Sequence, residues 1–450
     1  MIFPKILPPL AAQVQYIAYQ LKAFERSSKE NQKLVQQQQL QSLLSHAYQY
    51  SPFWRNRLDQ VNFSIDNNGK SFESFSRLPL LTRKDFQNSY ESLRARWPEI
   101  NEKQIVTAIT SGSTGQPIQV EKIFDIYNLL FLAVDYLGNE WHLLDAEKTL
   151  ALIETKCEEK TQISWGYLYD QLGLKGKVIS RNIDLYSMES HLEWLTLIQP
   201  NYLKCSPFVA ANLAKLALEN RQPVQISAVI SQWETVSLSQ RKLCYDAFGA
   251  KIIDRYSCEE IGWIAIQCPK YNHLHIMSGT VLVEILDLEG QPCGIGQAGR
   301  VVITGLHSYA MPIIRYEIGD IAEWGESCDC GINLPVIKKL HGRVRHMLRL
   351  PSGRTTPMPH IGDDIGAISS INEFRVLQYR SGEVEVQINA KQKLTLEECM
   401  FIRKIVHESI SLMEIVTIHV TEVDKIDWKS GYKRQEFMQI DRLWSQVNHS

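Results

Sequence analysis

Short apolar runs typical of β-strands alternate with helix-forming segments through the middle of the chain, from residue 105 to residue 254. We predict a helix from Ser237 to Phe248, closed by Gly249, and strands at 105–109, 149–153, 224–230 and 251–254. Strands that alternate with helices pack into a sheet with helices on its faces, so the pattern predicts an α/β fold. The 450 residues exceed one ordinary core, so two or three domains are expected.

The pattern changes twice farther along the chain. The segments VLVEILD, GRVVITGL and DIAEW follow one another without helices between them, which predicts a β-rich subdomain at about residues 270–340. The region after Gly342 predicts a small α+β domain, from a helix that begins at about residue 396 and strands at 374–379, 383–388 and 415–420. We therefore expect a large N-terminal body, residues 1–342, and a small mobile cap, residues 343–450.

Two helices are expected in the N-terminal region. Apolar residues recur at three-and-four spacing within residues 34–50, and Pro52 ends the pattern. The glutamine run at 36–39 falls inside this helix, and we expect it to form a solvated face. Thr82 is placed to cap a second helix, with Asp85 reaching back to the cap.

The charge balance and the hydropathy exclude several classes of protein. Lys plus Arg number 48 against 50 for Asp plus Glu, so no overall field favours nucleic acid or an acidic membrane. No apolar run approaches the roughly 20 residues of a membrane-spanning helix, and two early prolines make a poor signal peptide. We expect a cytoplasmic protein without a nucleic-acid partner or transmembrane segment. The sequence leaves its oligomeric state open, a homodimer included.

The strongest local motif is a loop rich in glycine and hydroxyl groups that follows the strand at 105–109. It reads Thr110-Ser111-Gly112-Ser113-Thr114-Gly115. The glycines permit tight turns, and the hydroxyl and backbone N–H groups can surround polyphosphate oxygens. Taken alone, such a loop has an ordinary surface Ser/Gly loop as its alternative explanation.

Five further segments give this loop a more specific meaning. They are LSHAYQYSPFWRNRL (44–58), LPLLTRKDF (78–86), YSCEEIG (256–262), RYEIGD (315–320) and Gly342-Arg343. Together with the loop, which matches the pattern TSGSTGxP, they resemble in order the adenylate-forming superfamily of acyl-CoA synthetases, adenylation domains and luciferases. The resemblance is to the phenylacetate-CoA ligase-like subgroup in particular, and it runs from about residue 40 to the C-terminal region.

The resemblance implies roles for particular residues. Glu260 would help to hold Mg²⁺, for which a hard carboxylate is suited, and Asp320 would accept hydrogen bonds from the ribose hydroxyls of ATP. Arg343 would contact ribose or phosphate, as the family's interdomain arginine does. Without the resemblance, the alternative explanation is that Glu260, like its neighbour Glu259, is a solvated acid at a strand end. The corresponding explanation for Asp320 is a turn residue.

Two more residues match the adenine pocket of the family. Glu234 corresponds to an acidic residue beside the adenine, although Trp233 here replaces a small residue. Tyr256 would stack on the adenine, with core packing as the alternative for an aromatic residue at a strand end.

Three departures from the family pattern affect the expected mechanism. Ser257 replaces a glycine, and His346 replaces the aspartate about which the cap turns. The lysine of the C-terminal SGK motif is displaced by one residue, and we favour Lys433 over Lys429 and Lys425 for its role. That lysine stabilises charge at the α-phosphate, where a displacement of about 1 Å can cost about a hundredfold in rate.

The resemblance implies ATP-dependent activation of a carboxylic acid, and the subgroup implies an aromatic one. The carboxylate would attack the α-phosphate to give acyl-AMP and pyrophosphate, and the acyl group would then pass to a thiol, with coenzyme A preferred. The alternative acceptors are an amine, an alcohol or a carrier protein. The alternative class is a catalytically impaired nucleotide-binding protein.

The nine cysteines are spread over the chain in an odd number, which does not fit a secreted disulfide framework. Four residues, Cys268, His275, Cys328 and Cys330, have the side chains of a four-coordinate structural zinc site. Some proteins of the resembled subgroup have a similar pattern, and a zinc ion would join the segments that follow the two acidic motifs. The alternatives are two thiols near a turn and an ordinary strand histidine.

Overall fold

The structure is a computed structural model. It describes residues 8–63, 75–110, 117–155, 157–232, 234–343, 347–349, 355–357, 365, 368, 370–380, 382–410, 417–426 and 437–440. Within these ranges no helix combines the length and the apolar character needed to cross a bilayer.

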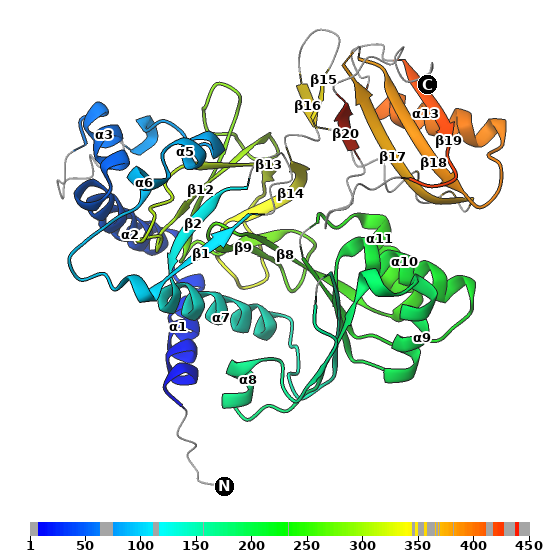
Figure 1. Cartoon of the computed structure of the whole chain (residues 1–450), viewed down its shortest axis with the longest axis horizontal. Coiled ribbons are helices and arrows are strands. Elements are labelled where there is room, and N and C mark those ends of the chain that lie inside the picture. The colour runs from blue at the N-terminus through cyan, green and yellow to red at the C-terminus, as the bar shows by residue number, and fades with distance from the viewer. Residues whose placement is uncertain are drawn as a thin grey trace.

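A mixed sheet of 12 strands forms the centre of the molecule (Figure 1). From one edge to the other its strands are β11 (Val281–Leu286), β12 (Ala298–Gly305), β13 (Tyr316–Trp324), β14 (Val336–Arg343), β10 (Leu274–Ile276), β9 (Gly262–Gln267), β8 (Lys251–Cys258), β7 (Ala228–Gln232), β6 (Tyr202–Cys205), β3 (Leu150–Glu154), β5 (Val178–Asn182) and β4 (Thr161–Gln162). The five strands β8, β7, β6, β3 and β5 are parallel, and the others pair antiparallel. The β-rich region thus continues the α/β sheet directly.

Helices cover the parallel half of the sheet, as the alternating pattern predicts. They include α9 (Met188–Ile198), α10 (Pro207–Glu219) and α11 (Leu238–Phe248), which pack on the strands through Leu192, Leu213 and Phe248. Ser237 caps α11, and Gly249 ends it in the left-handed conformation with φ of 70°. The short helix α8 (Tyr167–Gln171) follows β4.

One predicted strand begins later than expected. The chain from Val224 to Ser227 is a connection, and β7 starts at Ala228. Val224 and Ile226 are nevertheless buried, because the connection packs beneath α11. Apolar side chains in a buried connection have the composition of a strand, which explains the difference.

Most of the N-terminal helices pack against the antiparallel half of the sheet, whereas the first packs mainly on the helix at Phe124–Trp141. They are α1 (Pro9–Glu25), α2 (Lys29–Tyr50), α3 (Pro52–Gln60), α5 (Arg83–Asn88) and α6 (Tyr90–Leu93). Leu40, Leu43 and Leu44 of α2 are buried in the same core as Ile276 and Val281. At the start of α5, Thr82 and Asp85 form the predicted capping box.

The expectation of a solvated face was wrong for Gln36 and Gln39 of the glutamine run, whereas Gln38 is exposed. Gln36 and Gln39 donate from their Nε2 atoms to the carbonyl oxygens of Ser278 and Gly279, at 2.8 and 2.9 Å. The carbonyls of a tight turn need donors when a helix covers them, and these amides supply them.

A β-hairpin and a long helix stand beside the main sheet. The hairpin pairs β1 (Ile105–Ile109) with β2 (Gln119–Ile123), and α7 (Phe124–Trp141) follows at once. The Gly/Ser-rich loop connects these two strands. The hairpin and α7 bring the residues after the loop close to the turn between β8 and β9.

The C-terminal region has a sheet and a core of its own. β19 (Ile418–Glu422), β18 (Val384–Ala390), β17 (Ile371–Tyr379) and β20 (Phe437–Ile440) form it, with α13 (Leu396–Ile410) packed on one face (Figure 1). A two-stranded sheet of β15 (Met347–Arg349) and β16 (Thr355–Pro357) lies between this region and the body. Lys391 pairs with Glu219 of α10 across the two regions. The domain boundary at residues 342 and 343 stays a prediction.

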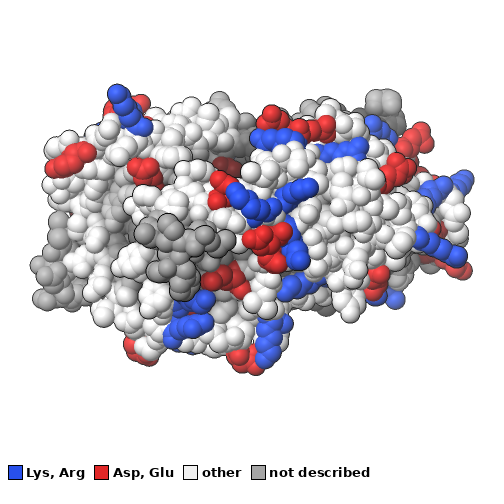
Figure 2. Space-filling view, turned by 90° about the horizontal axis from the view of Figure 1, so that it is seen from below, with Lys and Arg blue, Asp and Glu red and all other residues white. Residues whose placement is uncertain are grey.

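Positive and negative side chains are interspersed on the face shown in Figure 2. No large area of one sign is visible there, which agrees with the near-equal numbers of acidic and basic residues in the sequence.

Candidate active site

Two of the predicted nucleotide-binding residues touch each other. The Tyr256 hydroxyl, near the end of β8, donates to Oδ2 of Asp320 in β13 over 2.7 Å. Arg343 lies directly opposite Asp320 in the β13–β14 ladder. The sheet therefore places three residues from three motifs in one neighbourhood, although β8 and β13 are not adjacent strands.

Glu260 lies in the turn between β8 and β9, and only 8% of the residue is exposed. Its Oε1 accepts a 3.1 Å hydrogen bond from the hydroxyl of Tyr316, in the segment RYEIGD. The neighbouring Glu259 is exposed. A buried carboxylate that retains oxygen lone pairs is a suitable ligand for a hard cation, so the residue predicted to hold Mg²⁺ fits that role.

Arg315, the arginine of RYEIGD, holds the backbone of that segment in place. Arg315 is buried, pairs with both carboxylate oxygens of Glu284 at 3.0 Å, and donates to the carbonyl oxygens of Ser76 and Leu78. This bidentate geometry fixes the backbone just before Tyr316 and Asp320.

The other predicted nucleotide-binding residues are described in part. Thr110 closes the hairpin next to the Gly/Ser loop, where its backbone N–H donates to the Ile118 carbonyl and its Oγ1 accepts from the Ile118 N–H. Glu234 follows the carboxyl end of β7. Residues 111–116, Trp233, His346 and Lys433 lie outside the described residues, and their predicted roles stay predictions.

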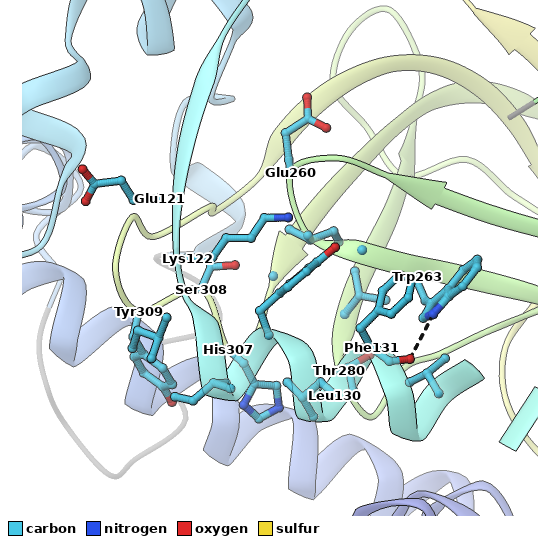
Figure 3. A pocket seen from close by; sticks show the side chains of 18 residues that line it. Glu121, Lys122, Leu130, Phe131, Glu260, Trp263, Thr280, His307, Ser308 and Tyr309 are labelled. Atoms are coloured by element: carbon cyan, nitrogen blue, oxygen red, sulfur yellow. Dashed lines mark hydrogen bonds between the residues drawn. The ribbon is translucent and has the colours of Figure 1, made fainter. Parts of the chain in front are cut away.

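A cavity lies between β2, α7 and the turn that carries Glu260 (Figure 3). Its walls include aromatic rings of Tyr127, Phe131 and Trp263, and the last two rings are stacked with centroids 4.9 Å apart. Gly262 has φ of 91°, and a Cβ there would lie 3.2 Å from the Tyr127 ring, so glycine both allows the turn and leaves room for the aromatic wall. The cavity can hold a small, largely apolar group beside Glu260.

Lys122 is a residue of this cavity that sequence reasoning missed. It is 8% exposed, and its Nζ lies 3.6 Å from the centroid of the Tyr127 ring. Burial lowers the pKa of Lys122, and the acidic groups of Cys258, Glu259 and Glu260 act in the opposite direction. No sequence signal marked it, because β2 reads QVEKI and a lysine in so polar a strand is ordinarily exposed.

The four predicted zinc ligands come together at one end of β9, β10 and β14. The ligand atoms of Cys268, His275, Cys328 and Cys330 all lie within 4.8 Å of one another. The Cys268 and Cys328 sulfurs are 3.8 Å apart, and the Cys330 sulfur is 3.2 Å from His275 Nε2. Tetrahedral thiolates bound at roughly 2.3 Å from zinc are about 3.8 Å apart, so the spacing fits a zinc ion.

The histidine of this cluster is also oriented for metal binding. His275 Nδ1 lies 3.3 Å from the Leu334 carbonyl oxygen, so the carbonyl can accept the ring proton. A protonated Nδ1 leaves the lone pair on Nε2, which is the atom that faces the cysteines. None of the nine cysteines forms a disulfide bond.

Comparisons with known proteins point to one family. No family model matches the chain. The phenylacetate-coenzyme A ligase of Thermus thermophilus is 24% identical over 406 residues, which cover 86% of each chain. That of Pseudomonas putida is 23% identical over 385 residues, which cover 79% of this chain and 82% of the relative. A crystal structure of 2-hydroxyisobutyryl-CoA ligase in the postadenylation state, in complex with 2-HIB-AMP, has a TM-score of 0.75 and 19% identity and covers 94% of this chain and 93% of that one.

The fold and the motif residues therefore define a class. The chain has the fold of the adenylate-forming ligases. Over most of its length it is similar in sequence to phenylacetate-coenzyme A ligases. The resemblance found in the motifs and the expected α/β architecture with a C-terminal cap are confirmed.

Proposed function

We propose that the protein is an AMP-forming acid–thiol ligase. It activates a carboxylic acid with ATP, releases pyrophosphate, and transfers the acyl group from acyl-AMP to a thiol, with coenzyme A as the acceptor. The curated relatives named phenylacetate-coenzyme A ligase support this activity.

One observation carries the proposal: the segments 256–262 and 315–320 meet in the fold. Tyr256 contacts Asp320 at 2.7 Å, and Tyr316 contacts Glu260 at 3.1 Å. Each contact joins a residue of one motif to a carboxylate of the other. A site that binds ribose at Asp320 and phosphate with Mg²⁺ at Glu260 needs both carboxylates on the same side of the sheet, and these contacts provide that arrangement.

The chemistry requires little of the protein beyond positioning. An oxygen of the substrate carboxylate attacks the α-phosphorus of ATP, and the bond to the bridging oxygen of pyrophosphate breaks. The thiol sulfur then attacks the acyl carbon of acyl-AMP, and AMP leaves. No protein nucleophile is needed, so catalysis depends on holding the reactants in line and on stabilising charge at the α-phosphate. When bound, Mg²⁺ would neutralise phosphate charge.

Acid-dependent exchange of labelled pyrophosphate into ATP tests the first half-reaction, with a panel of aromatic and short aliphatic acids. We expect exchange that depends on one class of acid and on Mg²⁺. Mass analysis of products formed with coenzyme A, an amine or an alcohol then identifies the acceptor. A well-folded protein that binds ATP but exchanges no pyrophosphate with any acid would instead support the impaired nucleotide-binding alternative.

The Cys/His cluster supports a structural zinc as a second component of the proposal. It would hold the ends of β9, β10 and the β13–β14 connection together, next to the strands that carry Tyr256 and Asp320. Its role is structural because four protein ligands complete a tetrahedral site and leave no open position for substrate. A cytoplasmic location stays a prediction from the sequence.

A further inference from the structure

Lys122 is a buried cation that Glu259 and Glu260 influence only from beyond ion-pair distance. Among the described residues, no carboxylate forms an ion pair with it. The carboxylate of the adjacent Glu121 forms its ion pairs with Arg94 at 2.8 Å and with Arg96 at 2.9 Å instead. Charged side chains are almost never buried to this extent unless they are paired. The position of Lys122 therefore has a cost in stability, and that cost requires an explanation.

The neighbours of Lys122 lie around a cavity. The side chain extends from β2 toward the turn that carries Glu260 (Figure 3). The face of Tyr127 attracts its ammonium group, but a cation–π contact of about 0.5–2 kcal/mol does not replace an ion pair. One side of the ammonium thus borders the space in which a ligand would lie.

The β1–β2 register places Lys122 away from the phosphate loop. Lys122 pairs with Val106, whereas the loop begins after the pair Ile109–Gln119. Three residues of a strand span about 10 Å. A substrate that reacts beside the loop and reaches into the cavity would therefore meet Lys122 with the end remote from its reacting carboxylate.

We propose that Lys122 selects a carboxylic acid that carries a second carboxylate, so that the substrate class is a small dicarboxylic acid. This inference rests on the proposed ligase function. The second carboxylate pairs with Lys122 in the cavity, the aromatic wall of Tyr127, Phe131 and Trp263 contacts the carbon skeleton, and the first carboxylate is activated.

Matched acids that differ only in the remote group test this inference. Suitable pairs are phenylacetate with 4-carboxyphenylacetate, benzoate with terephthalate, and pentanoate with glutarate. We expect the wild-type protein to show at least tenfold higher kcat/KM in pyrophosphate exchange with the dicarboxylic member of at least one pair. Lys122→Met should remove that preference, and Lys122→Arg should keep most of it because it keeps the charge.

Control measurements separate this role from others. Lys242→Met removes an exposed lysine that pairs with Asp246, and it should leave the preference unchanged. Lys122→Met should also unfold at the same or a higher temperature than the wild type, because it removes an unpaired buried charge. A structural role for Lys122 predicts a lower unfolding temperature instead.

The outcomes distinguish this inference from the function on which it rests. Equal loss with both members of every pair in Lys122→Met would overturn it and would place Lys122 beside the reacting carboxylate. A wild-type preference for monocarboxylic acids in every pair would also overturn it, while the ligase function would stand. Exchange with no acid at all would overturn both.

Discussion

The Tyr256 hydroxyl donates a 2.7 Å hydrogen bond to the Asp320 carboxylate and so connects the end of β8 to β13 across the sheet. One partner was expected to bind the adenine and the other the ribose. Their contact means that a change in either residue should affect the binding of ATP rather than only the chemical step.

We expect Asp320→Asn to raise the KM for ATP by about tenfold to a hundredfold, because a charged acceptor of two ribose hydroxyls becomes a neutral amide. Tyr256→Phe keeps the aromatic ring and loses a single hydrogen bond to a carboxylate, worth about 1.5–3 kcal/mol, so its effect should not exceed about a hundredfold. Pyrophosphate exchange at varied ATP measures both. A wild-type KM in a well-folded Asp320→Asn protein would remove Asp320 from the nucleotide site.

Glu260 and Glu259 provide a matched pair for the metal site. Glu260→Gln should slow adenylation by about a hundredfold, which is the typical effect of removing one group that stabilises charge in the transition state. Glu259→Gln should change the rate little, because the Glu259 side chain is exposed. Rates should be measured over a range of Mg²⁺ concentrations. The opposite ranking of the two variants would show that the motif alignment is shifted by one residue.

Residues placed by local backbone geometry could be predicted from the sequence. The capping box of Thr82 and Asp85 and the αL end of α11 at Gly249 depend on neighbours a few residues away. The motifs could also locate Glu260 and Asp320, because each lies at a distinctive position within its own segment.

Residues whose surroundings depend on distant segments could not be predicted in this way. Gln36 was expected in solvent, but it bonds to Ser278, which is 242 positions away. Lys122 was not singled out at all, because its burial depends on α7 and the β8–β9 turn, which lie beside it only in the fold. The Cys/His cluster was an intermediate case. Its residue types suggested a metal, and only the fold shows that β9, β10 and the β13–β14 connection bring the four ligands together.

The two half-reactions should respond differently to loss of Lys433. If this lysine stabilises charge at the α-phosphate, Lys433→Ala should slow formation of acyl-AMP by at least about a hundredfold. Attack of the thiol on acyl-AMP supplied to the enzyme should change far less. Lys429→Ala is the matched control and should be close to wild type in both assays. Equal losses in both half-reactions of Lys433→Ala would contradict the assignment.

Zinc content should depend on the cluster cysteines. Protein purified without a metal-affinity tag should contain about one zinc per chain, and Cys328→Ser should lose zinc and unfold at a lower temperature, because metal binding contributes to folding free energy. Cys157→Ser changes a cysteine outside the cluster and should retain the metal. A wild-type protein that is fully stable and free of metal would disprove the zinc proposal.

Glu25 should make the stability of the protein depend on pH. It lies at the end of α1, is 3% exposed, and accepts a 3.0 Å hydrogen bond from Trp141 Nε1. Burial raises its pKa from 4.5 to about 7. Between these values the folded state binds more protons than the unfolded state, so the free energy of unfolding falls as the pH rises from 4.5 to 7. A shift of this size corresponds to about 3 kcal/mol over the window.

Glu25→Gln keeps the acceptor for Trp141 and cannot ionise. We therefore expect this variant to match the wild type near pH 5 and to be more stable by about 3 kcal/mol, or less if the buried site relaxes, at pH 8. Urea unfolding at both pH values measures the difference, with Glu102→Gln as a control for an acid whose side chain is 75% exposed. The control should show no such difference between the two pH values. A constant offset between Glu25→Gln and the wild type at pH 5 and pH 8 would mean that Glu25 is ionised in the folded protein throughout this range, with its negative charge compensated by Arg26 and Lys22.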